Sequence, residues 1–347
     1  MRAVWTLALN SELTKGPAFD DAHVFLPIEG GRLVAYELAH GTQTWIVDAA
    51  PDRTPTAGGG FVFFVQDAEM VALHASDGSR AWTAPLDDGL AVKPSWAAGW
   101  LMLATESGAV VALRAADGHE IWRRDIGVLA HAPVAVSADH AYVPLEDHRV
   151  VALQIETGEP VWERRLGGTP NEILALDDRL FVGSTDNYFY CLTTDTGSRD
   201  WRWHTGADAI GMPAVDEQRV YFVSLDNVVR ALNRSNGVQQ WIQLLKLRPI
   251  GGPLRAGGTV IVYGQTPPLR AFNTVDGKGG GDIPAAGPVP ASAPPHLVDP
   301  DGPLPSLVVI TRDVAKGDTV TLLMRSVEPP ASPLAPLPNP ITALPKL

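Results

Sequence analysis

The chain has 347 residues, a formal net charge of −12 at pH 7 and a pI near 5.1. This acidic balance has no basic stripe to offset it, which argues against a nucleic-acid-binding protein. No apolar stretch reaches the roughly 20 residues that a transmembrane helix needs. Cys191 is the single cysteine, so an internal disulfide is excluded.

The first predicted element is a short strand in residues 1–9, which carries Trp5, 40 residues before Trp45. From Trp45 onward, the tryptophans advance by 37, 40, 40, 39 and 40 residues, so one module recurs along most of the chain. A fixed period in this range is typical of a propeller, a solenoid or another repeat array. The recurring tryptophans are Trp5, Trp45, Trp82, Trp122, Trp162, Trp201 and Trp241.

Each module has the same frame of Ala-Leu, four residues, Gly, three residues and Trp, as in Ala152, Gly158 and Trp162. The glycine follows Asp, Thr or Asn in most copies, which predicts a hairpin turn with a positive φ at the glycine. The frame glycines are Gly78, Gly118, Gly158, Gly197 and Gly237, with looser copies at Gly41 and Gly277.

Short β-branched and aromatic runs such as 219–224 precede each Ala-Leu pair, and shorter runs such as 212–215 lie further upstream. Together they predict four short antiparallel strands in each module of roughly 40 residues, with the tryptophan in the fourth. Such a module is typical of a β-propeller blade. A two-layer sandwich is the competing fold, but it would not repeat one hairpin in the same register. Since a single blade cannot bury both of its faces, we expect the tryptophans to pack neighbouring blades together.

The two ends of the chain are incomplete modules that complement each other. Residues 307–311 and 319–324 are predicted strands with no following tryptophan, whereas Trp5 lies in a last strand that lacks the first three. We therefore predict an all-β, eight-bladed β-propeller of four-stranded antiparallel blades, closed by the N-terminal strand pairing into the last blade. A single domain is expected over residues 1–328.

Two segments rich in proline interrupt or follow this pattern. We predict a Pro-rich insertion at about 284–305 and a Pro-rich C-terminal tail at 329–347, which contains seven prolines. Proline favours extended conformations without a core of their own, so a linker is expected, with partner recognition as the alternative.

The N-terminus bears on localisation. Strand-forming sequence begins by Val4, which leaves no room for a signal peptide. We therefore expect either a cytoplasmic protein or a mature chain whose leader was removed.

No motif for catalysis or metal binding stands out. No two of the nine histidines have a metal-ligand spacing with a carboxylate or cysteine nearby, and no nucleophile motif or phosphate-binding glycine loop is found. Cys191 is expected to be a small buried core residue. The sequence thus predicts no catalytic residue, no metal and no cofactor.

The loops that lead from each tryptophan strand into the next blade differ from copy to copy. Propellers gather these loops on one face, and variable loops on a rigid repeated scaffold usually carry binding. We predict partner contacts in these loops at Arg53, Lys93, Asn171, Asp208, Lys246 and Arg248.

The frame of Ala-Leu, Thr/Asp-Gly and Trp resembles the repeat of the pyrroloquinoline-quinone (PQQ) dehydrogenase propellers and of their non-enzymatic relatives. Over about residues 1–280 it is most similar to the BamB family, the periplasmic lipoproteins of the outer-membrane β-barrel assembly machinery. The resemblance implies a non-catalytic scaffold of the periplasm or cell envelope, which binds β-barrel assembly components through loops on one face. We expect such a protein to be a monomer.

This chain departs from both groups of relatives. The quinone enzymes carry a vicinal disulfide and calcium ligands, and Cys191 alone cannot form such a disulfide. The BamB family has a lipid-bearing N-terminal cysteine, which is absent from this sequence, and truncation would account for its absence. It also has an aspartate pair before the proline that opens a blade, and the matching stretch here has Asp208 followed by Ile210 in the second position. A ligand-binding or sensor propeller is the alternative function, and a quinone-dependent dehydrogenase is the less favoured one.

Overall fold

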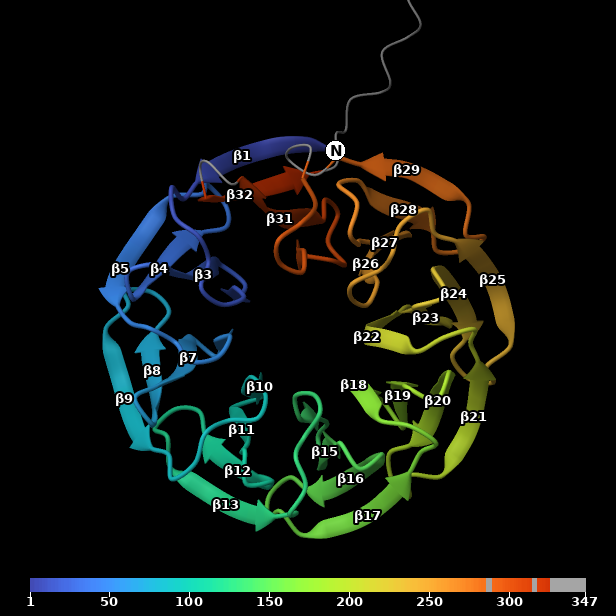
Figure 1. The fold of residues 1–347 in the computed structure, drawn as a ribbon, viewed down its shortest axis with the longest axis horizontal. Coiled ribbons are helices and arrows are strands. Elements are labelled where there is room, and N and C mark those ends of the chain that lie inside the picture. The colour runs from blue at the N-terminus through green and yellow to red at the C-terminus, as the bar shows by residue number, and fades with distance from the viewer. Residues whose placement is uncertain (285–288, 314–316, 325–347) are drawn as a thin grey trace, which may run out of the picture.

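The computed structural model describes residues 1–284, 289–313 and 317–324. These residues form eight four-stranded antiparallel sheets, arranged as blades around a central axis (Figure 1). The predicted eight-bladed β-propeller is therefore confirmed. In this part of the chain, no helix has the length and apolar character that a membrane span needs.

Blades 1 to 7 follow the chain in order, and each runs from an innermost strand at the axis to an outermost strand at the rim. Blade 1 consists of β2 (Ala18–Phe19), β3 (His23–Ile28), β4 (Arg32–Glu37) and β5 (Gln43–Asp48), and blade 2 of β6 (Thr56–Gly58), β7 (Phe61–Gln66), β8 (Glu69–His74) and β9 (Arg80–Pro85). Blade 3 consists of β10 (Ser95–Ala97), β11 (Trp100–Ala104), β12 (Ala109–Arg114) and β13 (Glu120–Asp125), and blade 4 of β14 (Ala135–Val136), β15 (His140–Pro144), β16 (Arg149–Gln154) and β17 (Pro160–Arg165). Blade 5 consists of β18 (Pro170–Leu176), β19 (Arg179–Ser184), β20 (Tyr188–Thr193) and β21 (Arg199–His204). Blade 6 consists of β22 (Ala209–Val215), β23 (Arg219–Ser224), β24 (Val228–Asn233) and β25 (Gln239–Leu244). Blade 7 consists of β26 (Leu254–Ala256), β27 (Thr259–Val262), β28 (Leu269–Asn273) and β29 (Gly279–Ile283).

Blade 8 is built from both ends of the described chain. Its inner strands are β30 (His296–Val298), β31 (Ser306–Asp313) and β32 (Gly317–Met324), and β1 (Arg2–Ala8) pairs antiparallel with β32 at the rim. In this ladder Trp5 lies opposite Leu322. The predicted closure by the N-terminal strand is thus confirmed, and it removes the sheet edges that an open array would expose.

The Pro-rich stretch 284–305 contributes to the fold. It contains β30, the innermost strand of blade 8, so the part of it that the structure describes is more than an insertion between strands. The prolines flank this short strand, where a missing backbone N–H is tolerated. The predicted tail, 329–347, lies outside the described residues.

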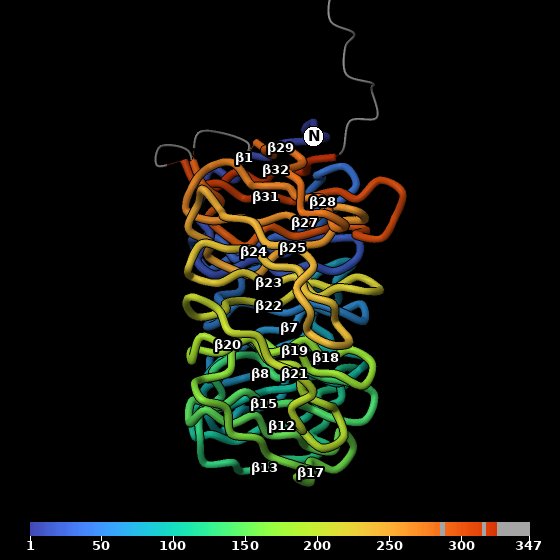
Figure 2. The backbone as a smooth tube through the Cα atoms, turned by 90° about the vertical axis from the view of Figure 1, so that its right-hand side faces the viewer, coloured from blue at the N-terminus to red at the C-terminus, as the bar shows by residue number. Residues whose placement is uncertain are grey.

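The middle strands of each blade are buried on both faces. Leu101, Val111 and Ala112, in β11 and β12, are at most 1% exposed, and the equivalent strands of the other blades are similar. Each sheet is sandwiched between two neighbours, which is why these strands are almost continuously apolar. From the side, the ring is a disc with loops projecting from two opposite faces (Figure 2).

The tryptophan of an outermost strand packs on the glycine turn of the next blade. Trp122 Nε1 donates a 2.7 Å hydrogen bond to the carbonyl of Ile155, and a Cβ on Gly158 would come within 2.5 Å of the indole. Gly158 also has a φ of +68°, so glycine is required both for the turn and for the approach of the ring. The other pairs are Trp5 with Gly41, Trp45 with Gly78, Trp82 with Gly118, Trp162 with Gly197, Trp201 with Gly237 and Trp241 with Gly277.

The seam between blades 7 and 8 lacks this pair. In blade 6, Trp241 lies opposite Ala231. The equivalent position of blade 7, opposite Ala271, is occupied by Gly281. Apart from its chain neighbours, no atom of the described residues lies within 4 Å of where its Cβ would be. The seam at which the chain closes is held instead by apolar side chains such as those of Ile283 and Leu307.

Candidate functional site

The loops between successive blades share one face of the disc. Since each blade has four antiparallel strands, its outermost strand ends on the face where the next innermost strand begins. We call this face the crossover face. Its loops between blades 1 and 7 span 49–55, 86–94, 126–134, 166–169, 205–208 and 245–253. Five of the six predicted contact residues lie in these loops, and Asn171 is the second residue of β18.

Three of the predicted contact residues are engaged within the protein. Arg53 Nη2 lies 2.9 Å from Glu106 Oε1, which ties the loop before blade 2 to blade 3. Asn171 Nδ2 donates a 2.5 Å hydrogen bond to the carbonyl of Ala209 and joins blade 5 to blade 6. Asp208 is half-buried, and its carbonyl accepts a 2.9 Å backbone hydrogen bond from a turn of its own blade. These contacts hold the loops in fixed positions.

The other three predicted contact residues are cationic and exposed. Lys93, Lys246 and Arg248 are exposed, and none forms a salt bridge with a residue that the structure describes. Lys246 and Arg248 lie in the same loop, which follows β25. The structure therefore places two free cations side by side along one segment of the crossover face.

The segment Leu244–Ile250 exposes every second side chain, and we call it the exposed strip. Leu244 is 79% exposed and Ile250 is 48% exposed, with the two cations of the loop between them. The alternate side chains are buried under the strip: Leu245, Leu247 and Pro249. Two apolar and two cationic groups thus line a path that leads from the outermost strand of blade 6 toward the innermost strand of blade 7.

Backbone hydrogen bonds fix the exposed strip on blades 6 and 7. The amide of Leu245 donates to the carbonyl of Asn227 at 2.8 Å, and the carbonyl of Arg248 accepts from the amide of Gln265 at 3.1 Å. Pro249 also forms an isolated antiparallel bridge with Gly264. The strip is therefore anchored at both its ends and along its buried side.

The innermost strands of blades 5 and 6 are longer than those of the other blades. β18 and β22 have seven residues each, and both contain a bulge. In β22 the bulge lies between Ile210 and Ala214, where Gly211 has a φ of +67° and a Cβ would fall 2.0 Å from the amide nitrogen of Gly252. A bulge re-aims its side chains, and here it leaves Met212 42% exposed at the axis.

A cavity of about 860 Å³ lies beside these bulges at the axis of the ring. Its lining includes Lys93, Glu172, Met212 and Tyr263. Tyr263 is 6% exposed, and burial raises its pKa to about 12, with the negative charge of Glu172 acting in the same direction. The phenol therefore keeps its proton at neutral pH and remains available as a donor.

Glu172, Met212 and Tyr263 were not predicted from the sequence. Met212 lies in the predicted strand run 212–215, but the run alone did not show that its side chain would be exposed at the axis. Glu172 and Tyr263 carry no comparable signal, since they meet only through the closure of the ring.

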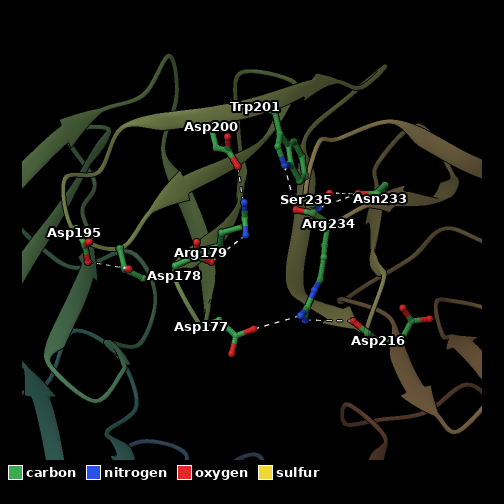
Figure 3. A network of polar contacts seen from close by, with 11 residues as sticks. Asp177, Asp178, Arg179, Asp195, Asp200, Trp201, Asp216, Asn233, Arg234 and Ser235 are labelled. Atoms are coloured by element: carbon green, nitrogen blue, oxygen red, sulfur yellow. Dashed lines mark hydrogen bonds and ion pairs between the residues drawn. The ribbon is translucent and has the colours of Figure 1, made fainter.

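A polar network reinforces the seam between blades 5 and 6 on the face opposite to the crossover face (Figure 3). Arg234 donates to the carboxylate of Asp177 at 3.3 Å and to the carbonyl of Asp216 at 3.4 Å. Trp201 Nε1 donates a 3.2 Å hydrogen bond to the carbonyl of Arg234. Arg234 thus links the β18–β19 turn of blade 5 to the β22–β23 turn of its own blade.

Comparisons with known proteins agree with this architecture. The sequence profile of one family, described as "Outer membrane protein assembly factor BamB", matches residues 2–93, 69–175 and 173–288. The chain belongs to the BamB family. A comparison with curated proteins finds no match.

Several solved structures share the fold. BamB from Moraxella catarrhalis has a TM-score of 0.71 and 20% identity, over 93% of this chain and 99% of that one. Quinohemoprotein alcohol dehydrogenase ADHIIG from Pseudomonas putida HK5 has a TM-score of 0.70 and 14% identity, over 97% and 78%. The computationally designed Ika8 protein has a TM-score of 0.72 and 11% identity, over 91% and 97%. At these identities the likeness shows the fold alone.

The described residues do not fit a quinone and calcium site of the kind that the dehydrogenase relatives imply. Cys191 is fully buried in β20, and burial raises the pKa of its thiol to about 12. Among the residues with a described position, no group of three or more His, Cys, Asp or Glu side chains is arranged to hold a metal ion. The buried position of Cys191, without a second cysteine beside it, is the feature that does not fit the vicinal disulfide of the quinone enzymes.

Proposed function

We propose that the protein is a non-catalytic scaffold that binds protein partners through its crossover face and acts in the assembly of outer-membrane proteins. Membership of the BamB family supports the role, and the exposed strip Leu244–Ile250 is the observation that carries it. The same proposal places the protein in the periplasm or cell envelope as a monomer.

The exposed strip has the composition of a protein-binding surface. Leu244 and Ile250 leave apolar area in water, and its burial is favourable by about 25 cal/mol per Å². The strip is also held rigid by its buried side chains, so little conformational entropy is lost when a partner binds. A preformed apolar path of this kind favours a protein partner over a small solute.

Charge adds specificity to the proposed contact. The chain as a whole has a formal charge of −12, yet Lys246 and Arg248 make the exposed strip locally basic. Complementary charge raises association rates and suppresses wrong partners. A partner with carboxylates beside an apolar surface therefore matches the strip.

Site-specific photo-crosslinking tests the proposal. A photoreactive amino acid replaces Lys246 in the full chain, in its native cells, and the attached protein is identified by mass spectrometry. The control replaces Glu217, which is exposed in the β22–β23 turn on the opposite face of the same blade. Capture of a β-barrel assembly component at position 246 and not at 217 is expected. Equal labelling at both positions, or none at 246, overturns the proposal.

A second candidate function rests on the cavity at the axis. With about 860 Å³, it is large enough for a small organic ligand, and Tyr263 and Glu172 supply a donor and an acceptor at its wall. A ligand sensor would be stabilised against heat by its ligand. A thermal-shift screen of small molecules with the wild type and with Glu172→Gln tests this candidate, which fails if no compound shifts the melting temperature.

A further inference from the structure

The outermost strand of every blade leaves one edge without a strand partner in the described part of the chain. Such edges pair with other chains unless charges or irregularities block them. Seven of the eight outermost strands contain a charged residue, and only β25, with the sequence QQWIQL, has none. The charges in the others include Arg2, Asp48, Arg80, Glu120, Glu163, Asp200 and Asp282.

The second half of β25 exposes two large apolar side chains. Trp241 is buried against blade 7, whereas Ile242 is 43% exposed and Leu244 is 79% exposed. Leu244 is the most exposed of the large hydrophobic residues that the structure describes. The edge therefore offers unblocked backbone groups together with apolar side chains.

We propose that β25 is a docking edge, to which an extended segment of a partner protein adds as a fifth strand of blade 6. The partner segment has apolar side chains at alternate positions, which cover Ile242 and Leu244, and a carboxylate that reaches Lys246 or Arg248. This inference rests on the proposed function, because it specifies how a protein partner contacts the same part of the molecule.

Continuity with the exposed strip favours an extended partner. From Ile242 to Ile250 every second residue is exposed, and none of the residues between them is. This period of two begins in β25, which ends at Leu244, and continues past a bend at Lys246 and Leu247. A helix presents side chains every three to four residues and cannot match it, whereas a strand has the same period.

Charge complementarity fixes one end of the partner segment. Lys246 and Arg248 follow β25 directly and form no salt bridge with a described residue, so the cations lie at the crossover end of the edge. The neighbouring edge strand β29 offers no such surface. It contains three glycines, and in the part of the chain that the structure describes no atom beyond their chain neighbours lies within 4 Å of the Cβ positions of Gly279 and Gly281.

Backbone-modified peptides test the pairing directly. The probe is a synthetic ten-residue peptide of alternating Val and Thr with two Glu at one end, made with the Glu pair at either end. Each peptide is also made with N-methyl groups on the odd or on the even amides. In a paired strand only alternate amides face β25. One methylated set should therefore bind at least about tenfold more weakly, and the other should bind like the parent peptide.

Matched variants of the protein locate the edge. Ile242→Lys places a charge on β25, and Ile46→Lys places the same charge at the equivalent position of β5, where Ile46 is also 43% exposed. Ile242→Lys should abolish peptide binding, whereas Ile46→Lys should leave it unchanged, and both should melt like the wild type. Hydrogen exchange should show protection of the β25 amides when the parent peptide binds.

The outcomes separate this inference from the proposed function. If a β-barrel assembly component is captured at position 246 but the two methylated sets bind equally, strand addition is wrong and docking on the crossover face stands. If no partner is captured at position 246 but one methylated set binds selectively, β25 is a docking edge for an extended segment, and the proposed role in outer-membrane protein assembly is wrong. If the protein dimerises and Ile242→Lys makes it monomeric, a second copy occupies β25, and the proposed partner is overturned.

Discussion

The indole of Trp122 in blade 3 lies against Gly158 in blade 4, where a side chain of any size would occupy the space of the ring. Its Nε1 reaches the carbonyl of Ile155, three residues before the glycine, at 2.7 Å. One contact thus combines a large apolar burial, a backbone hydrogen bond and a left-handed turn. Its recurrence at seven seams explains why the tryptophan, the glycine and their spacing recur together.

Replacing Trp122 separates packing from hydrogen bonding. Trp122→Ala should lower the free energy of unfolding by about 3–5 kcal/mol, because it opens a cavity at the seam. Trp122→Phe keeps an aromatic ring but loses the bond to Ile155 and part of the indole volume, so a smaller cost of about 1–3 kcal/mol is expected. Urea denaturation of both variants measures the difference. An unchanged midpoint for Trp122→Ala would show that the indole does not hold the seam.

Replacing Gly158 tests the other partner. Gly158→Ala adds the cost of a left-handed alanine, about 1–2 kcal/mol, to a steric overlap with the indole of about 1–3 kcal/mol. Gly127 is the matched control, since its φ is +73° and nothing lies within 4 Å of its Cβ position. Gly127→Ala should lower the free energy of unfolding only by the cost of a left-handed alanine, about 1–2 kcal/mol. Equal effects on the melting temperature would mean that the overlap with Trp122 is relieved at no cost.

Closure by β1 can be tested by truncation. Removal of residues 1–9 deletes the strand ladder with β32 and the wedge of Trp5 on Gly41, so it should destabilise the protein more than Trp5→Ala does. The difference in melting temperature between the two proteins measures what the β1–β32 ladder adds to the packing of Trp5 on Gly41. A truncated chain as stable as Trp5→Ala would show that the ladder contributes little.

Stability should also fall in mild acid because of His296. The ring stacks on Phe19 with centroids 3.9 Å apart, and burial lowers its pKa to about 4 from an ordinary value of 6.5. As the pH falls from 6.5 toward 4, the unfolded chain takes up a proton that the folded protein does not, so folding weakens over this range. His296→Phe keeps the stacking and removes this titration. Denaturant midpoints between pH 4 and pH 7 should therefore fall more steeply for the wild type; parallel curves would contradict the assignment.

Much of the fold was predictable from the sequence, because the repeat is encoded locally. Gly158 and Trp162 are four residues apart in one hairpin, and the residues that specify a turn and a strand lie within that hairpin. The position of Trp5 one period before Trp45 was enough to predict that the N-terminal strand completes the last blade. The Pro-rich stretch 284–305 was understood less well, since β30 is too short to show a strand pattern among prolines.

The candidate site was only partly predictable. The sequence determined which loops share one face, since that follows from the even number of strands in a blade. It did not determine that Arg53 and Asn171 are engaged within the protein, that Lys246 and Arg248 are free, or that Leu244 beside them is exposed. Those properties depend on contacts between modules about 40 residues apart, and only the packing of one blade on the next brings such residues together.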